Sequence, residues 1–273
     1  MNQCAIRQIY TPFFITLRVI DYIKDIPCVK ITDRILQQWL DELEEEHSPK
    51  TLKNAYSLIH ASLMEVLPRS TVLDWRIKLP TISKKKVVVP SMEEINTLLS
   101  YFKENDKDMY IVCLLSAFGT MRRSEMCGLT AEDVCDNIIS INKALVLNGD
   151  SHDWILKTTK TEQSTRDVVM PVKVIKELPK EVRIVNLTPS AVTDRFIRAR
   201  RKLNINDDVT LHCLRHFSAS IMHELGALNE TIMRRGGWSN DFTLNRHYRG
   251  SIEEYDRAFT DKLNNTLENA FMN

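Results

Sequence analysis

Apolar residues recur at intervals of three and four along two stretches near the start of the chain, residues 35–43 (ILQQWLDEL) and 52–67 (LKNAYSLIHASLMEVL). This spacing places the apolar side chains on one face of a helix. Thr32 and Asp33 precede the first stretch, and Ser48 and Pro49 precede the second, which are residue types that start helices. The pattern predicts two amphipathic helices.

Beyond them, residues 90–94 (PSMEE) have the pattern of a capping box and predict a helix that continues through residue 102. An apolar run at 109–118 follows. The next apolar stretches are short and rich in Ile, Val and Leu, which is typical of strands: 138–141 and 144–147, then a second strand pair at 154–156 and 167–170. From residue 190 onward the period is mostly helical, with a stop near Gly236 and Gly237. The predicted class is α+β, mainly α with a small antiparallel β-sheet.

A chain of 273 residues exceeds the usual size of one hydrophobic core, which predicts two domains. Leu79 and Pro80 close the first helical region, and a lysine run follows at residues 84–86. We therefore expect an N-terminal helical domain over residues 1–80, a linker at 81–90 and a larger domain over 91–273.

Composition narrows the class of protein. Hydrophobic residues make up 43% of the chain and charged residues 27%, as in folded soluble proteins, and no stretch reaches the ~18 apolar residues of a membrane span. Six cysteines without a Cys-x-x-Cys pair are typical of reduced thiols, so we expect a cytoplasmic protein. Only seven glycines are present and no Walker or dinucleotide loop, which disfavours ATP and NAD chemistry. A net charge of +1 weakly disfavours nucleic-acid binding, although local charge decides.

Two arginines are the first candidates for chemistry. Guanidinium groups stay charged and clamp phosphate oxygens in a two-pronged geometry, and Arg122 and Arg215 suit that task. Taken alone, each is more often a surface or ion-paired residue. Arg122 follows an apolar helix that can hold it rigidly, and Glu125 lies one turn further on, where it could orient the guanidinium. Arg123 is the competing arginine.

Further candidates follow the second arginine box. His212 shares a helix face with Arg215, and a neutral imidazole beside a phosphate can move a proton. Its spacing to His216 also fits a structural pair or a metal site, but Arg215 lies between them and no His-Glu-x-x-His sequence occurs, so we expect no metal. Lys160 lies between the second pair of predicted strands, where a hairpin could present it, and Trp238 could donate its indole N–H to a phosphate or pack in a core.

The ordered motifs resemble those of the tyrosine recombinases, the phage-type integrases, from about residue 33 to the end of the chain. Four segments carry the resemblance: 121–125 (MRRSE), 160–166 (KTEQSTR), 212–216 (HCLRH) and 237–239 (GWS), where the family more often has His than Trp. Tyr248 follows Trp238 by 248 − 238 = 10 positions, as the family's nucleophile does.

The resemblance implies a site-specific recombinase that cleaves and rejoins DNA through a 3′-phosphotyrosyl intermediate, for integration or excision of a mobile element, without a cofactor. The catalytic residues it implies are Arg122, Lys160, His212, Arg215, Trp238 and Tyr248. Lys157 is a near alternative to Lys160, and Tyr255 is a spare tyrosine that misses the family spacing. The rival functions are a type IB-like topoisomerase and an inactive DNA-binding remnant.

Residues 33–80 resemble the family's helical core-binding domain, which with the catalytic domain closes around double-stranded DNA. Candidate phosphate contacts are Lys50, Lys53, Lys84, Lys85, Lys86, Arg195, Arg198 and Lys202. The last three equally fit a solvated helix face.

The resemblance also implies a homo-tetramer on DNA, with accessory directionality and DNA-bending proteins as further partners. Leu263, Leu267 and Phe271 recur at i,i+4 spacing near the C-terminus and could pack into a neighbouring protomer or onto their own core. The residues before Ile31 are too few and too apolar to supply the arm-binding domain found in many integrases, which fits a truncated copy or a simpler recombinase.

Overall fold

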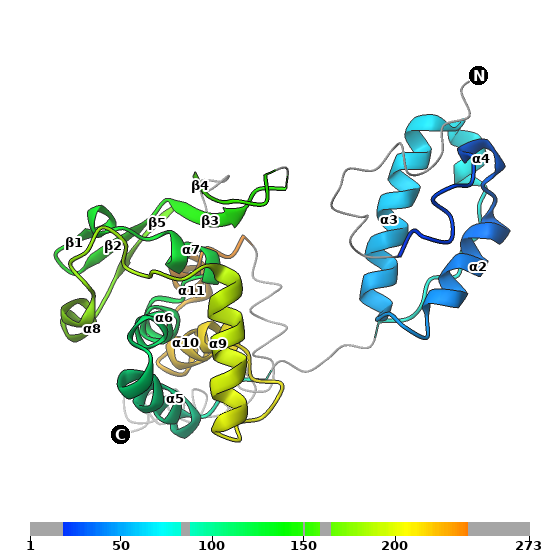
Figure 1. Cartoon of the computed structure of the whole chain (residues 1–273). Helices are drawn as coiled ribbons and strands as arrows, with labels where there is room; N and C mark the ends of the chain where they lie inside the picture. The colour runs from blue at the N-terminus through cyan, green and yellow to red at the C-terminus, as the bar shows by residue number, and fades with distance from the viewer. Residues whose placement is uncertain (1–18, 83–87, 150, 159–164, 240–273) are drawn as a thin grey trace, which may run out of the picture. The chain divides into compact units, whose positions relative to one another are not determined.

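The computed structural model describes residues 19–82, 88–149, 151–158 and 165–239 (Figure 1). The chain divides into two compact units, with the boundary near residue 85, and each unit has its own buried apolar cluster. The functional domains expected at 1–80 and 91–273 stay a prediction, because compactness alone does not establish what either unit does. None of the helices in the described ranges combines the length and apolar character needed to cross a membrane.

The first unit is helical. Its described residues form a 3₁₀ turn and three α-helices: η2 (Cys28–Lys30), α2 (Asp33–Leu43), α3 (Pro49–Val66) and α4 (Arg69–Leu73). The side chains of Thr32 and Ser48 accept from backbone N–H groups in the first turns of α2 and α3, as expected from the sequence. Trp39 is fully buried in the shared core and donates its indole N–H to the Val19 carbonyl at 2.6 Å.

The second unit is built around one apolar helix. Its helices are α5 (Met92–Asn105), α6 (Lys107–Gly119), α7 (Arg123–Gly128), η3 (Ala131–Asp133), α8 (Val172–Glu177), α9 (Pro189–Lys202), α10 (Leu211–Glu224) and α11 (Asn229–Gly236). The helix α6 packs against α5, α7, α9 and α10, which explains why its sequence is apolar on nearly every side (Figure 1). Ser91 and Glu94 form the expected capping box at the start of α5.

The part of the second unit that the structure describes also has five short strands: β1 (Val134–Cys135), β2 (Ile138–Ile141), β3 (Lys143–Leu147), β4 (Trp154–Thr158) and β5 (Arg166–Val169). They form a three-stranded antiparallel sheet in the order β1-β2-β5 and a separate antiparallel pair of β3 with β4. The predicted class, mainly α with small antiparallel sheets, is confirmed.

The expected pairing of residues 154–156 with 167–170 is wrong. The strand β5 pairs with β2 instead, and Ile139 lies opposite Val168 with both side chains fully buried. The strand β4 pairs with its neighbour in sequence, β3. Apolar composition located the strands, but it did not distinguish a local hairpin from a pairing between distant segments.

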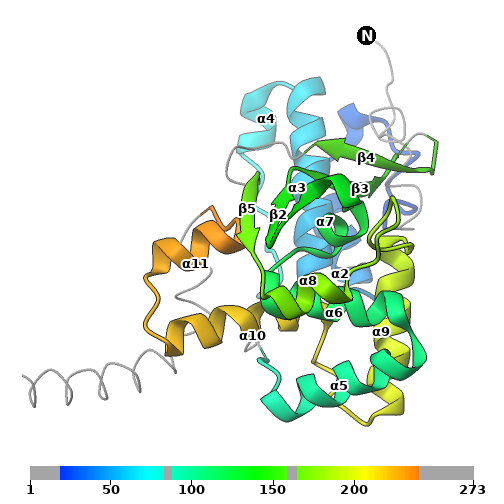
Figure 2. The same ribbon diagram turned by 90° about the vertical axis from the view of Figure 1, so that its left-hand side faces the viewer.

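Close packing of β3 on α7 fixes the element that begins beside Arg122. Gly128 ends α7, and a Cβ added there would lie 3.0 Å from the backbone nitrogen of Leu145 on β3. A Cβ at that distance would require the backbone of β3 to move away, so glycine suits this position. In Figure 2, α11 lies beside β5, and the two elements are in contact. Hydrogen bonds of Arg122 and Arg166 connect the starts of α7 and β5 with the end of α11, so these three segments lie in one region.

Candidate active site around Arg122

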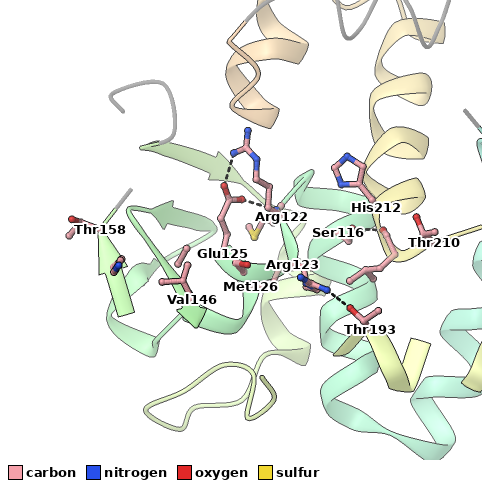
Figure 3. A pocket seen from close by; sticks show the side chains of 15 residues that line it. Ser116, Arg122, Arg123, Glu125, Met126, Val146, Thr158, Thr193, Thr210 and His212 are labelled. Carbon is pink, nitrogen blue, oxygen red and sulfur yellow. Dashed lines mark hydrogen bonds and ion pairs between the residues drawn. The ribbon is translucent and has the colours of Figure 1, made fainter. Parts of the chain in front are cut away.

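Arg122 immediately precedes α7 and is held by Glu125 one turn further on. The Glu125 carboxylate accepts from the backbone N–H of Arg122 and from its Nη1, both at 2.7 Å (Figure 3). The Nη2 of Arg122 donates to the carbonyl of Gly237 at the end of α11. The contact expected between Glu125 and Arg122 is present, and it leaves the Arg122 side chain 39% exposed.

A second arginine, Arg166 at the start of β5, shares the same carboxylate. Its Nη2 and Nη1 lie 2.8 and 3.1 Å from the two Glu125 oxygens, and both side chains are almost completely buried. Burial by itself would raise the pKa of Glu125, but the hydrogen bond and charge of Arg166, with the bonds from Arg122, outweigh it and lower that pKa to about 2. Glu125 is therefore a carboxylate at neutral pH.

Arg166 ends one of the four sequence motifs, but its role was not predicted from the sequence. The alternation of β5 was the signal: Arg166 and Val168 point inward, whereas Asp167 and Val169 are exposed. An arginine at an inward position of a strand requires a buried acceptor. Its partner lies 41 positions earlier in the chain, so the sequence did not identify it.

Arg215 lies in the second turn of α10 and is buried, with 1% of its surface exposed. It donates Nη1 to the carbonyl of Thr120 and Nη2 to that of Gly236 at 2.6 Å. Its guanidinium carbon lies 3.9 Å from the centre of a Trp238 ring, the geometry of a cation–π contact. Arg215 is thus not the surface residue that a lone arginine usually is.

The end of α11 joins these arginines. Three consecutive carbonyls accept from three of them: Arg235 from Arg166 Nε at 2.8 Å, Gly236 from Arg215, and Gly237 from Arg122. The last carbonyls of a helix have no partner within the helix and carry partial negative charge, so they suit cations. The three guanidinium groups are in this way tied to one helix end.

Glycine is needed at both positions that follow Arg235. A Cβ on Gly236 would lie 1.9 Å from the Trp238 ring. Gly237 has a φ of 64°, in the left-handed region, and a Cβ there would lie 2.9 Å from Arg166 Nη1 and 3.2 Å from Arg122 Nη1. The stop predicted near Gly236 and Gly237 is confirmed, and it allows the backbone to approach the arginines.

Arg122 and Arg123, the two candidates for the first catalytic arginine, have different hydrogen-bond partners. Arg123 donates to the hydroxyl of Thr193 on α9, whereas Arg122 turns to Glu125 and the end of α11 (Figure 3). The geometry therefore separates Arg122, which joins the arginine group, from Arg123, which does not.

His212 lies in the first turn of α10, is exposed and faces a cavity (Figure 3). Its ring meets that of His216 edge to face at 4.7 Å, and His216 is buried. Within the described ranges, His, Cys, Asp and Glu side chains form no group of three or more that could hold a metal ion.

Burial raises the pKa of the Cys127 thiol to about 12. The nearby charges of Arg123 and Arg183 lower that pKa more weakly, so the thiol is protonated.

The cavity measures about 620 Å³ and lies between α7, β3, β4 and the first turn of α10. Arg122, Arg123 and His212 line it, with Lys157 and Thr158 from β4. Lys157, the alternative to Lys160, is therefore at the cavity. Lys160, Tyr248 and Tyr255 lie outside the described residues.

The candidate DNA-contact residues fall in different environments. Lys50 is exposed in the first turn of α3, Lys53 is half-buried in the second turn of that helix, and Arg198 is exposed on α9. Arg195 is paired with Asp106 at 2.9 Å, and the Lys202 amine lies 5.1 Å from the centre of the Tyr101 ring. Contact with DNA stays a prediction for all five. Residues 84–86, 263, 267 and 271 lie outside the described part of the chain.

Known proteins resemble this chain in sequence and in fold. The model of the phage integrase family matches residues 90–254. An integrase of Staphylococcus phage L54a is 23% identical over 287 residues, which cover 86% of this chain and 79% of the phage protein. The Tn1549 transposon integrase, solved in complex with transposon right end DNA, superimposes with a TM-score of 0.74 at 16% identity, covering 95% of this chain and 99% of that one. A lambda integrase dimer bound to a COC′ core site gives 0.58 at 15% identity, covering 87% and 72%. The family model covers more than half of the sequence and includes both arginine boxes, so the chain belongs to the phage integrase family.

Proposed function

We propose that Tyr248 of this tyrosine recombinase attacks a phosphate of double-stranded DNA. The tyrosine oxygen bonds to phosphorus, the bond to the 5′ oxygen breaks, and a 3′-phosphotyrosyl enzyme and a 5′ hydroxyl result. The 5′ hydroxyl of a partner strand then attacks the phosphotyrosine, which rejoins the DNA and releases the tyrosine. The ester retains most of the free energy of the cleaved bond, so the exchange needs no nucleotide or metal. As a phage integrase family member, the protein is a site-specific DNA recombinase.

The proposed roles follow the chemistry of each side chain. Arg122 and Arg215 stabilise the negative charge that develops on the non-bridging oxygens. His212 exchanges the tyrosine proton, and Lys160 protonates the leaving 5′ oxygen. Trp238 donates its indole N–H to the phosphate and has no proton to exchange at neutral pH.

One observation carries the proposal. Arg122 and Arg215 both donate to carbonyls at the end of α11, and the Trp238 ring contacts Arg215. Tyr248 follows Trp238 by ten positions, 248 − 238 = 10, so a short segment separates the nucleophile from the anchored arginines. Such a segment is short enough to bring the tyrosine to a phosphate held by them.

We extend the proposal to the whole molecule. Residues 33–80 serve as the core-binding domain and 91–273 as the catalytic domain, and the two close around the duplex. The enzyme assembles as a homo-tetramer on DNA and works with accessory directionality and DNA-bending proteins. Because its substrate is the DNA of a mobile element and its host, we place its action in the cytoplasm.

Covalent capture tests the proposal. The protein and its Tyr248→Phe variant are mixed with fragments of the source genome, denatured in detergent, and the DNA that stays attached to protein is sequenced. We expect attachment at a few sites with the wild type and none with the variant, while both bind DNA before denaturation. Equal attachment by the variant, or none by a folded wild type that binds DNA, would overturn the proposed nucleophile.

A further inference from the structure

Arg166 is a buried arginine that connects two elements of the candidate site. Its two terminal nitrogens donate to both Glu125 oxygens, and its Nε donates to the Arg235 carbonyl at 2.8 Å. One side chain on β5 therefore holds the start of α7 and the end of α11. These are the two elements from which Arg122 is presented, because Arg122 itself donates to Glu125 and to Gly237.

The charges of this group do not cancel. Arg122 and Arg166 carry two positive charges, and Glu125 carries one negative charge at neutral pH, which leaves one positive charge. The Arg166 and Glu125 side chains are each 4% exposed, but that of Arg122 is 39% exposed and lines the cavity. Of these three side chains, Arg122 is therefore the one that a ligand in the cavity can contact. Without Arg166, the pair of Arg122 with Glu125 would be neutral, and Arg122 would attract a phosphate less strongly.

We propose that Arg166 is a positioning residue for strand cleavage, which shares the charge of Glu125 and so leaves Arg122 as an oriented and only partly compensated cation at the scissile phosphate. The inference rests on the proposed role of Arg122. Arg166 touches neither DNA nor the reacting atoms; it acts through Glu125 and through the end of α11.

The competing explanation is that Arg166 only stabilises the fold. A set of variants that change the charge of the group distinguishes a positioning role from a purely structural one. Arg166→Gln makes the group neutral, Arg166→Lys keeps its charge, and the double variant Glu125→Gln with Arg166→Gln restores one positive charge on Arg122. The readout is the single-turnover rate of covalent complex formation on a nicked duplex that carries the site recovered by covalent capture. Thermal unfolding of each variant is measured alongside.

We expect Arg166→Gln to cleave about 10- to 100-fold more slowly than the wild type, which is less than the about 100- to 1000-fold loss seen when a transition-state donor is itself removed. Arg166→Lys should stay within about tenfold of the wild type, and the double variant should recover at least about tenfold over Arg166→Gln. A double variant no faster than Arg166→Gln would overturn the inference. If Arg166→Gln does not fold, a folded Arg166→Lys that cleaves over a hundredfold more slowly than the wild type overturns it instead.

The pH dependence of the cleavage rate is a second test of the positioning role. Arg166 is the main group that lowers the pKa of Glu125, so in Arg166→Gln that pKa should rise and the carboxylate should become easier to protonate. Protonation restores the positive charge, and the rate of Arg166→Gln relative to wild type should increase as the pH is lowered from 7 toward 4.5, the ordinary pKa of the carboxyl group. Taking the ratio of the two rates at each pH removes the effect of every titratable group that the two proteins share. A flat ratio argues for a purely structural role.

Covalent complex formation by the wild-type protein shows whether a negative result contradicts this inference alone or the proposed function as well. A wild type that forms no covalent complex overturns both, because there is then no cleavage for Arg166 to assist. A wild type that cleaves, beside an equally fast and folded Arg166→Gln, overturns only the role of Arg166.

Discussion

Glu125 shares one charge between two arginines, and its protonation would break both contacts. The Glu125 pKa lies at about 2, below its ordinary value of 4.5. A carboxylate whose pKa is lowered by folding stabilises the protein above its unfolded pKa and loses that contribution as the pH falls through its folded pKa. This part of the stability should therefore be complete above about pH 4.5 and disappear toward pH 2.

Thermal unfolding between pH 6 and pH 2 measures this contribution. The wild type should lose melting temperature more steeply below about pH 4.5 than Glu125→Gln, which has no group to protonate there. Glu132→Gln is the matched control, because Glu132 is exposed on the neighbouring η3 and should leave the wild-type slope unchanged. Parallel curves for the wild type and Glu125→Gln would contradict the shared-charge description.

Trp238 combines two functions that substitutions can separate. Its ring lies over Arg215, and its indole N–H is the proposed donor to the phosphate. Trp238→Phe keeps an aromatic face but removes the donor, so we expect near-normal stability and a cleavage rate lower by about 100- to 1000-fold. Trp238→Ala removes the cation–π contact as well and should also cost about 0.5–2 kcal/mol of stability. A Phe variant with the wild-type rate would leave only the stacking role.

Among the helices and strands, the end of α11 matters most for the site, because its backbone carbonyls bind three arginines. The glycines at positions 236 and 237 allow this close approach. Gly236→Ala would place a Cβ 1.9 Å from the Trp238 ring, so the ring must move away from Arg215. Overpacking of this kind costs about 1–3 kcal/mol. We expect a lower unfolding free energy and slower cleavage than in the wild type.

Gly149→Ala is the control for that substitution, because among the described residues no atom beyond the chain neighbours of Gly149 lies within 4 Å of the Cβ it would add. Chemical unfolding of both variants, with single-turnover cleavage, gives the comparison. If Gly236→Ala matches Gly149→Ala in both, the helix end is not closely packed against Trp238.

The elements also show where sequence reasoning succeeds and stops. Periodicity and caps predicted α2, α3, α5 and α6, because those signals lie within each segment. The pairing of β5 with β2, and the salt bridge of Arg166 with Glu125, connect residues far apart in sequence. Local patterns do not contain that information. The sequence placed this strand at residues 167–170, so it predicted neither the inward position of Arg166 nor its partner.

For the molecule as a whole, the net charge of +1 means that DNA affinity must come from local clusters of Lys and Arg. Lys50 and Lys53 at the start of α3 are such a cluster. Replacing both with Ala should weaken DNA binding and reduce the slope of log affinity against log salt by about 1.8, that is, about 0.9 for each phosphate that is no longer neutralised.

Lys176→Ala is the control for this measurement, because Lys176 is exposed on α8 and outside the candidate set. A salt titration by fluorescence anisotropy on duplex DNA should give the wild-type slope for Lys176→Ala. An unchanged slope for the double variant would mean that α3 does not contact phosphates through these lysines.

The most direct test of the proposed chemistry is the identity of the residue that becomes linked to DNA. The trapped covalent complex is digested with nuclease and protease, and the peptide that keeps a nucleotide is sequenced by mass spectrometry. We expect the nucleotide on Tyr248, in a peptide that disappears in Tyr248→Phe. A nucleotide on Tyr255, or on any other residue, would contradict the proposed mechanism.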